Sequence, residues 1–201
     1  MKLELIKSDD KRLKEVSKEV LDFTKDYKSI IESIKEVCLE KSAYAAAAPQ
    51  FGINERFILV MTDNKVCEMD EKIKKFVITS YFNPVITKME GAQIYYEACM
   101  SVNNAIGRVK RPFRIKFRYQ DIDGSKHVKT VEGFEAIIIC HEIDHLDGIE
   151  YIDRADIIYY DVNVGQRKSI RERNPHEILS ISEEFKYQSV RMIVKQYSDE
   201  N

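Results

Sequence analysis

The feature that most limits how this chain can fold is a pair of histidines at the end of an apolar segment. Residues 141–145 follow an H-E-x-x-H pattern, and residues 134–140 before them are apolar except for Glu135. A helix that is apolar nearly all round is typical of a protein interior. On such a helix His141 and His145 share one face, because positions i and i+4 lie one above the other. Their ring nitrogens then need partners, since unpaired buried polar groups are costly.

A metal ion is the partner that this spacing favours. Two imidazoles on one helix face can bind one ion, and Glu142 between them can reach a water molecule beside it. The alternative interpretation is a chance spacing, but these two are half of the four histidines in the chain and have a carboxylate between them. We therefore expect a metal site on this helix.

The third ligand is less certain from the residues alone, because catalytic sites of this kind usually have three protein ligands. One class of metalloproteases has a histidine three residues after the glycine of this pattern, but here Tyr151 occupies that position. Glu172 and Glu177 are downstream alternatives. Upstream, Cys99 is attractive, since a thiolate binds Fe(II) or Zn(II) well.

Composition limits the class of protein. The chain has 201 residues, 44% hydrophobic and 33% charged, which indicates one globular domain or at most two. A net charge of −2 gives no reason to expect DNA as a partner. We expect no membrane partner either, because no apolar run is long enough to span one. Residues 1–11 lack the apolar core of a signal peptide, so the cytoplasm is the expected location. The four cysteines are sparse, which favours free thiols or metal ligands over disulfides.

Periodicity predicts an α+β fold, with antiparallel or mixed β-sheets packed around a buried central helix that carries H-E-x-x-H. Helical spacing is seen from Leu13 to Val20 and more strongly over residues 26–40. Strands are expected over residues 56–61, 81–86 (within the segment 76–86), 109–119 and 127–131, with residues 62–75 as a surface excursion. Pro84 indicates an edge or a bulge in its strand.

The alanine-rich segment over residues 43–52 has conflicting signals. Alanine favours helix, but Pro49 disfavours the α conformation at Ala48, and Gly52 marks a turn. An extended segment followed by a turn is the expected structure. Taken alone, Gln50 in this segment is most simply a surface amide.

Three segments in this order resemble the motifs of the peptide deformylase family. Residues 43–50 (A-Y-A-A-A-A-P-Q) are similar to G-x-G-[hydrophobic]-A-A-x-Q, and residues 97–101 (E-A-C-M-S) to E-G-C-L-S. Residues 140–148 (C-H-E-I-D-H-L-D-G) are similar to Q-H-E-x-D-H-L-x-G. The similarity runs from about residue 3 to residue 156. Alanines replace glycines at Ala43, Ala45 and Ala98, which bears on substrate fit more than on reaction type.

The resemblance implies a hydrolase that removes the N-formyl group from the N-terminal methionine of new polypeptides and releases formate. It implies one divalent metal ion, Fe(II) first, with Zn(II) or Ni(II) as substitutes. Glu142 would be the general base, and Gln50 with the backbone N–H of Met100 would stabilise the oxyanion. A pairing of Glu97 with Arg111 would support the site. The implied metal ligands are Cys99, His141 and His145, and the implied substrate-binding residues are Tyr44, Ala45 and Ile137, the last with Phe134 and Ile138 in a methionine pocket.

The resemblance also implies how the chain is divided and what it meets. Residues 1–160 would form the metallohydrolase domain, and residues 161–201 a C-terminal extension, helical over about 176–196 and packed on the same domain. The resemblance implies N-formyl-Met nascent peptides as partners. For the extension, which lies outside the matched region, a helix packed on the core is the first interpretation. Docking to the ribosome, for which the basic run over residues 167–173 would suit RNA phosphates, is the alternative. Two alternatives stay open: a related metallo-amidohydrolase with an altered substrate, and a metal-binding relative without catalysis.

Overall fold

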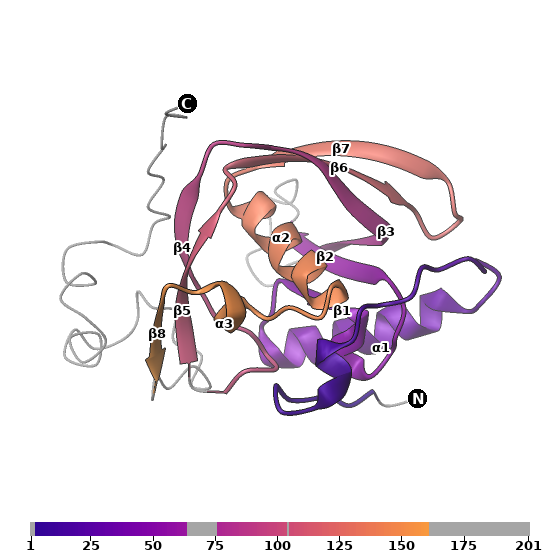
Figure 1. Ribbon diagram of the computed structural model, residues 1–201. Coiled ribbons are helices and arrows are strands. Elements are labelled where there is room, and N and C mark those ends of the chain that lie inside the picture. The colour runs from indigo at the N-terminus through magenta and orange to yellow at the C-terminus, as the bar shows by residue number, and fades with distance from the viewer. Residues whose placement is uncertain (1–2, 64–75, 104, 161–201) are drawn as a thin grey trace, which may run out of the picture.

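The structure is a computed structural model that describes residues 3–63, 76–103 and 105–160. It has two antiparallel sheets and few helices, so the expected α+β class is confirmed (Figure 1). The elements in chain order are η1 (Lys11–Lys14), α1 (Tyr27–Lys41), β1 (Ala45–Ala47), η2 (Ala48–Phe51), β2 (Phe57–Asp63), β3 (Phe76–Glu90), β4 (Gln93–Glu97), β5 (Ala105–Arg111), β6 (Arg114–Gln120), β7 (Lys126–Glu132), α2 (Phe134–Leu146), α3 (Tyr151–Arg154) and β8 (Ile157–Tyr160).

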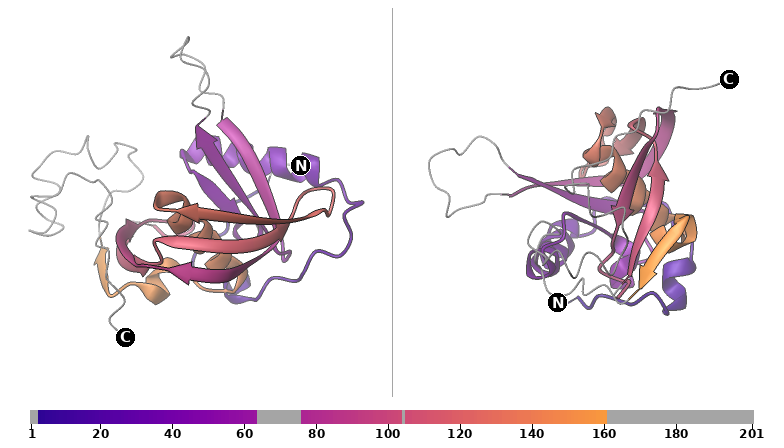
Figure 2. Two further views of the ribbon diagram at one scale, coloured as in Figure 1. Left: turned by 90° about the horizontal axis from the view of Figure 1, so that it is seen from above. Right: turned by 90° about the vertical axis from the view of Figure 1, so that its left-hand side faces the viewer.

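The strands form a larger sheet in the order β1-β2-β3-β6-β7 and a smaller one in the order β4-β5-β8. Helix α2 contacts β1, β2 and β7 of the larger sheet and β5 of the smaller one. Figure 2 shows the same arrangement from two further sides. The helix that carries the histidines therefore meets both sheets, which places its side chains close to the end of β4.

Alternating side chains of β1 and β2 divide the core between two helices. Ile58 and Val60 pack with the apolar face of α2, whereas Phe57 and Leu59 pack with α1 on the opposite face of the sheet. Successive residues of a strand point to opposite faces, which explains the division. The predicted helix over residues 26–40 is thus confirmed as α1, and its buried Cys38 is a core residue.

Glycines bound helix α2 at both ends. Gly133 precedes it with φ 60°, and Gly148 follows it with φ 72°. A Cβ atom at Gly148 would lie 2.5 Å from the carbonyl oxygen of Lys14, so only glycine fits where the N-terminal segment crosses the end of the helix. The helix expected between these two glycines is confirmed.

Two expectations from the pattern are wrong. Residues Leu13 to Val20 do not form an α-helix: η1 ends at Lys14, and Val16 is 67% exposed. After Lys14, the backbone instead forms hydrogen bonds with distant parts of the chain. For example, the Ser17 N–H donates to the Leu146 carbonyl. The single strand expected over residues 109–119 is two strands in different sheets, β5 and β6, because Pro112 between them has no N–H to donate.

Some expected features lie outside the described residues. These are most of the excursion over residues 62–75, with Cys67, and all of the C-terminal extension from residue 161. Strand β8 was not expected and pairs with β5. In the described part of the chain, no helix is long and apolar enough to cross a membrane.

Pro84 marks a bulge and not an edge, because β3 lies between β2 and β6. The register shifts between Phe82 and Val85, and Asn83 has φ 49°. The Asn83 side chain accepts from the Val20 N–H at 2.8 Å, and its amide donates to the Val20 carbonyl at 2.8 Å and to Gln120 Oε1 at 2.8 Å. One buried asparagine thus joins the N-terminal segment to the sheet.

We expect Asn83→Ala to lower the free energy of unfolding by roughly 4 kcal/mol, from three lost hydrogen bonds at ~1 kcal/mol each and ~1 kcal/mol for alanine at positive φ. Urea unfolding followed by circular dichroism measures it. Asn54→Ala is the matched control, because the hydrogen bonds of that amide are exposed to solvent. Equal losses for both variants would contradict this role for Asn83.

Candidate metal centre

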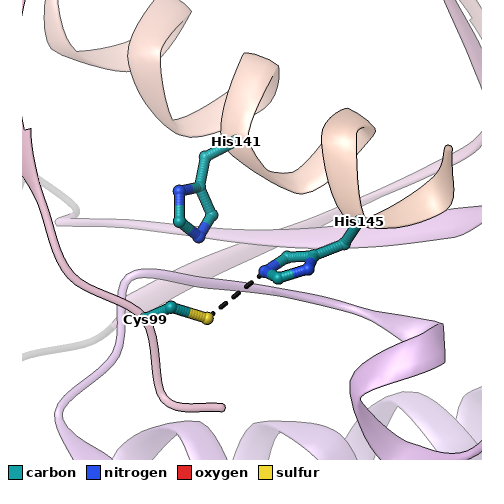
Figure 3. Close-up of side chains that lie close together, drawn as sticks. All are labelled: Cys99, His141 and His145. Atoms are coloured by element: carbon teal, nitrogen blue, oxygen red, sulfur yellow. Dashed lines mark hydrogen bonds between the residues drawn. The ribbon is translucent and has the colours of Figure 1, made fainter. Parts of the chain in front are cut away.

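Cys99, His141 and His145 come together although their segments are far apart in the sequence. One ligand atom of each lies within 4.8 Å of the others. Cys99 Sγ is 3.3 Å from His145 Nε2, and the two imidazole rings have centroids 5.0 Å apart. Figure 3 shows both rings projecting from successive turns of α2 toward the sulfur. The alternative ligands Glu172 and Glu177 lie outside the described residues.

Glu97 holds the ring of His141. Its Oε2 lies 2.7 Å from His141 Nδ1, and the side chain is 3% exposed. Burial alone would raise the pKa of Glu97, but hydrogen bonds from Arg111 and His141 outweigh it and lower the pKa to about 2. An ionised carboxylate only accepts, so the ring proton is on Nδ1 and Nε2 faces the cluster. A carboxylate behind a ligating histidine is the usual support of a metal site.

Arg111 joins this carboxylate to the helix. Its Nε donates to Glu97 Oε1 at 2.6 Å and its Nη2 to Glu97 Oε2 at 2.8 Å, which confirms the expected pairing. Its Nη1 donates to Asp144, which also binds Arg154 from α3. Arg111 is 4% exposed, so this is a buried ion cluster that links β4, β5, α2 and α3. Asp144 and Arg154 were not identified from the sequence as parts of the site, and only Asp144 within the H-E-x-x-H segment offered a signal.

Glu142 is buried on the same helix as the two histidines, and one of its carboxylate oxygens lacks a hydrogen-bond partner among the described residues. It is 5% exposed, and its Oε2 has no hydrogen-bond partner among the described residues. Burial raises the pKa of Glu142 to about 7. A carboxyl group with this pKa can take up and release a proton near neutral pH.

The surroundings of the two histidines shift their pKa values in opposite directions. Burial lowers the pKa of His145 well below its usual value, so the ring is neutral, as a metal ligand must be. Burial also acts to lower the pKa of His141, but hydrogen bonds to Cys99 and Glu97 outweigh it and raise the pKa well above its usual value. Cys38 and Cys140 are buried thiols whose pKa burial raises to about 12 in each case, so neither offers a thiolate.

Gln50 is 1% exposed, so its interpretation as a surface amide is wrong. Its Oε1 accepts from the Ala47 N–H at 2.9 Å, which turns the amide NH₂ toward the cluster. That NH₂ donates to Cys99 Sγ at 3.2 Å and to Ser101 Oγ at 3.3 Å. Met100 lies next to Cys99 at the same turn and is partly buried. The sulfur thus receives the Gln50 amide and the Ser101 backbone N–H, the latter at 3.4 Å.

The expected substrate-binding residues lie along β1 and α2. Strand β1 ends the order of the larger sheet, so one of its edges is unpaired among the described strands. Tyr44 precedes it, is 56% exposed and packs edge-to-face on Phe134 with ring centroids 5.9 Å apart. Ala45 pairs with Val60, and Ile137 is buried in α2.

The alanines of the first motif are not strained. Among the described residues, only Ser42 and Asn83 combine a side chain with a positive φ. Ala43 and Ala45 therefore have ordinary backbone conformations, and replacing glycine by alanine at these two positions costs no backbone strain.

Comparisons with known proteins agree on one family. The family model described as Polypeptide deformylase matches residues 2–159. A peptide deformylase of Caldicellulosiruptor bescii is 31% identical over 161 residues, 80% of this chain and 90% of the relative. A peptide deformylase 2 of Clostridium acetobutylicum is 35% identical over 147 residues, 73% of this chain and 90% of the relative.

Solved structures agree with these relatives. A probable peptide deformylase from synechococcus phage S-SSM7 superposes with a TM-score of 0.68 at 30% identity and covers 76% of this chain and 99% of its own. The peptide deformylase of Thermotoga maritima has a TM-score of 0.68 at 27% identity and covers 78% of this chain and 99% of its own.

We expect Arg111→Met to lower the free energy of unfolding by roughly 3–5 kcal/mol, because it removes the arginine that pairs with the buried Glu97 and one of the two arginines that pair with Asp144. Arg114→Met removes the Arg114–Glu132 pair, whose side chains are 48% and 58% exposed, and should cost ~0–1 kcal/mol. Urea unfolding of the two variants makes the comparison. Similar losses of unfolding free energy in both variants would show that the buried ion cluster contributes no more to stability than the exposed Arg114–Glu132 pair.

Proposed function

The chain belongs to the peptide deformylase family, and we propose that its buried cysteine and histidines hold the metal ion on which hydrolysis in this family depends. The enzyme removes the N-formyl group from nascent polypeptides. The observation that carries the proposal is the meeting of Cys99, His141 and His145 within 4.8 Å, with the buried Glu142 on the same helix. We further propose N-formyl-Met peptides as the substrates and formate as the released product.

The donor set fits a divalent transition metal. One thiolate and two imidazoles suit Fe(II), Zn(II) or Ni(II), and we propose Fe(II) as the native ion. Glu97 occupies Nδ1 of His141 and leaves Nε2 for the ion, while Nε2 of His145 already faces the sulfur. When bound, the ion would act as a Lewis acid that makes a water molecule and the formyl carbonyl more reactive.

Glu142 moves the proton in this proposal. With its pKa raised to about 7 and one carboxylate oxygen unpaired among the described residues, it can accept a proton from the attacking water. It then delivers this proton to the amine that leaves as the C–N bond of the formamide breaks.

Gln50 and Met100 stabilise the charge that develops on the formyl oxygen. The Gln50 amide is held by the Ala47 N–H, so its NH₂ is already directed to the site before the substrate binds. The backbone N–H of Met100 is the proposed second donor. One such donor is worth ~3 kcal/mol of barrier.

The substrate chain adds as a strand to the open edge of β1 in this proposal, along Tyr44 and Ala45, with main-chain hydrogen bonds. The methionine side chain would lie against Ile137, Phe134 and Ile138. Residues 1–160 then form the catalytic domain. The role of residues 161–201, contact with the ribosome and a cytoplasmic location remain predictions.

Metal analysis tests the ligands. We expect Cys99→Ser and His145→Ala each to lower the affinity for Fe(II) or Zn(II). The decrease should exceed the ~10–100-fold that follows the loss of a residue that only hydrogen-bonds to a ligand. His127→Ala is the matched control, because its side chain is 43% exposed and it pairs with Asp121. Anaerobic purification and elemental analysis give the metal content, and full occupancy in the Cys99→Ser variant would contradict the assignment.

Formate release from a formyl-Met peptide tests the reaction. We expect Glu142→Gln to slow kcat by roughly 10²–10⁴-fold, because the proton shuttle is lost, while the metal content stays unchanged. Glu132→Gln, on the exposed face of β7, should keep the wild-type rate.

Comparison with an acetyl-Met peptide and with formyl peptides that lack methionine separates an altered substrate from the proposed one. The proposal fails if the metal-loaded wild-type chain releases no formate.

A further inference from the structure

Besides Oε2 of Glu142, two polar atoms on α2 or just after it are buried and lack a hydrogen-bond partner among the described residues. One is Nδ1 of His145 and the other is Oε1 of Glu150, and both residues are 0% exposed. A buried polar atom without a partner costs ~1–3 kcal/mol. No direct bond joins the two atoms, but one can donate and the other can accept, so a single water molecule between them could give both a partner.

The path of the chain brings Glu150 past His145. Helix α2 ends at Leu146, and the chain reverses at Gly148, where the Ile149 N–H donates to the Asp144 carbonyl at 2.9 Å. The ring of Tyr151 then stacks on His141 with centroids 6.0 Å apart. Since His145 is one turn closer to the helix end on the same face, the segment that carries Tyr151 back to His141 must pass it. Glu150 is the residue directly before Tyr151.

The other carboxylate oxygen of Glu150 is fully engaged. Oε2 accepts from Ser8 Oγ at 3.0 Å and lies 3.0 Å from Lys14 Nζ. The Ser8 N–H donates to the carbonyl of Ser101, two residues beyond the metal-site cysteine. The carboxylate is therefore anchored through Oε2 to the N-terminal segment, and Oε1 is left for another partner.

His141 provides the comparison, because its Nδ1 has Glu97 at 2.7 Å. Ligating histidines almost always donate their second ring N–H to a carboxylate, a carbonyl or a water. We propose that Glu150 is the positioning residue of His145: one buried water molecule accepts the Nδ1–H and donates to Oε1, and this bridge keeps Nε2 directed at the metal and Cys99. The inference rests on the metal site proposed above and adds a second carboxylate behind it.

This role separates metal affinity from stability. A buried ion pair contributes little net stability, and apolar replacements of similar volume are often neutral or stabilising. Lys14 would keep Asp153 at 2.8 Å if Glu150 were replaced. Glu150→Leu should therefore leave the unfolding temperature near that of the wild type while it weakens metal binding.

Chelator competition with Zn(II) on the full chain measures this directly. We expect the dissociation constant of Glu150→Leu to rise ~10–100-fold, the usual effect of removing such a partner. Ser8→Ala is the matched control, because it removes a bond to Oε2 and leaves Oε1 in place; its dissociation constant should equal that of the wild type. Unchanged affinity in Glu150→Leu, or equal losses in both variants, would overturn the proposal.

Nitrogen-15 NMR of the histidine rings gives a readout that does not depend on activity or on a folded variant. In the wild-type chain, with and without Zn(II), we expect an Nδ1 proton on His145 protected from exchange, as on His141, which serves as the internal reference. Glu150→Leu should lose this protection at His145 and keep it at His141. A rapidly exchanging Nδ1 proton on His145 in the Zn(II)-loaded wild type would overturn the role of Glu150. Absence of formate release, in contrast, would contradict only the proposed function.

Discussion

The buried guanidinium of Arg111 is the interaction on which the rest of the site depends. It bonds to Glu97 at the end of β4 and to Asp144 on α2. Cys99 follows β4 by two residues, and His145 follows Asp144 by one. The same ion cluster therefore sets the distance between the thiol and the imidazoles. A displacement of the helix relative to β4 would separate the ligands and leave charges buried without partners at the same time.

Burial acts on both Glu97 and Glu142, and their partners decide how the pKa of each carboxylate shifts. Glu97 has Arg111 and His141, so its pKa falls to about 2. Glu142, on the same helix as His141, has an unpartnered oxygen among the described residues, and its pKa rises to about 7. One carboxylate is thus held ionised as a support while the other can exchange a proton near neutral pH. The two roles follow from hydrogen bonding and not from residue type.

Local patterns predicted what depends on local structure. The spacing of apolar residues found α1 and α2, and Pro49 with Gly52 indicated the extended segment and turn that hold Gln50. The resemblance of three motifs pointed to Cys99 and to the Glu97–Arg111 pair, which periodicity does not reveal. Contacts between separate segments stayed hidden: Asp144 binds both Arg111 and Arg154, and Glu150 binds Ser8 and Lys14. The extended course of the chain after Lys14 also depends on such contacts, which override its helical spacing.

X-ray absorption at the zinc edge of the Zn(II)-loaded enzyme tests the central claim most directly, namely that one thiol and two imidazoles hold a single ion. The account predicts one sulfur near ~2.3 Å and two imidazole nitrogens near ~2.0–2.1 Å, the usual lengths for such ligands on Zn(II), with the sulfur signal lost in Cys99→Ser. A wild-type spectrum with only nitrogen and oxygen neighbours would contradict it.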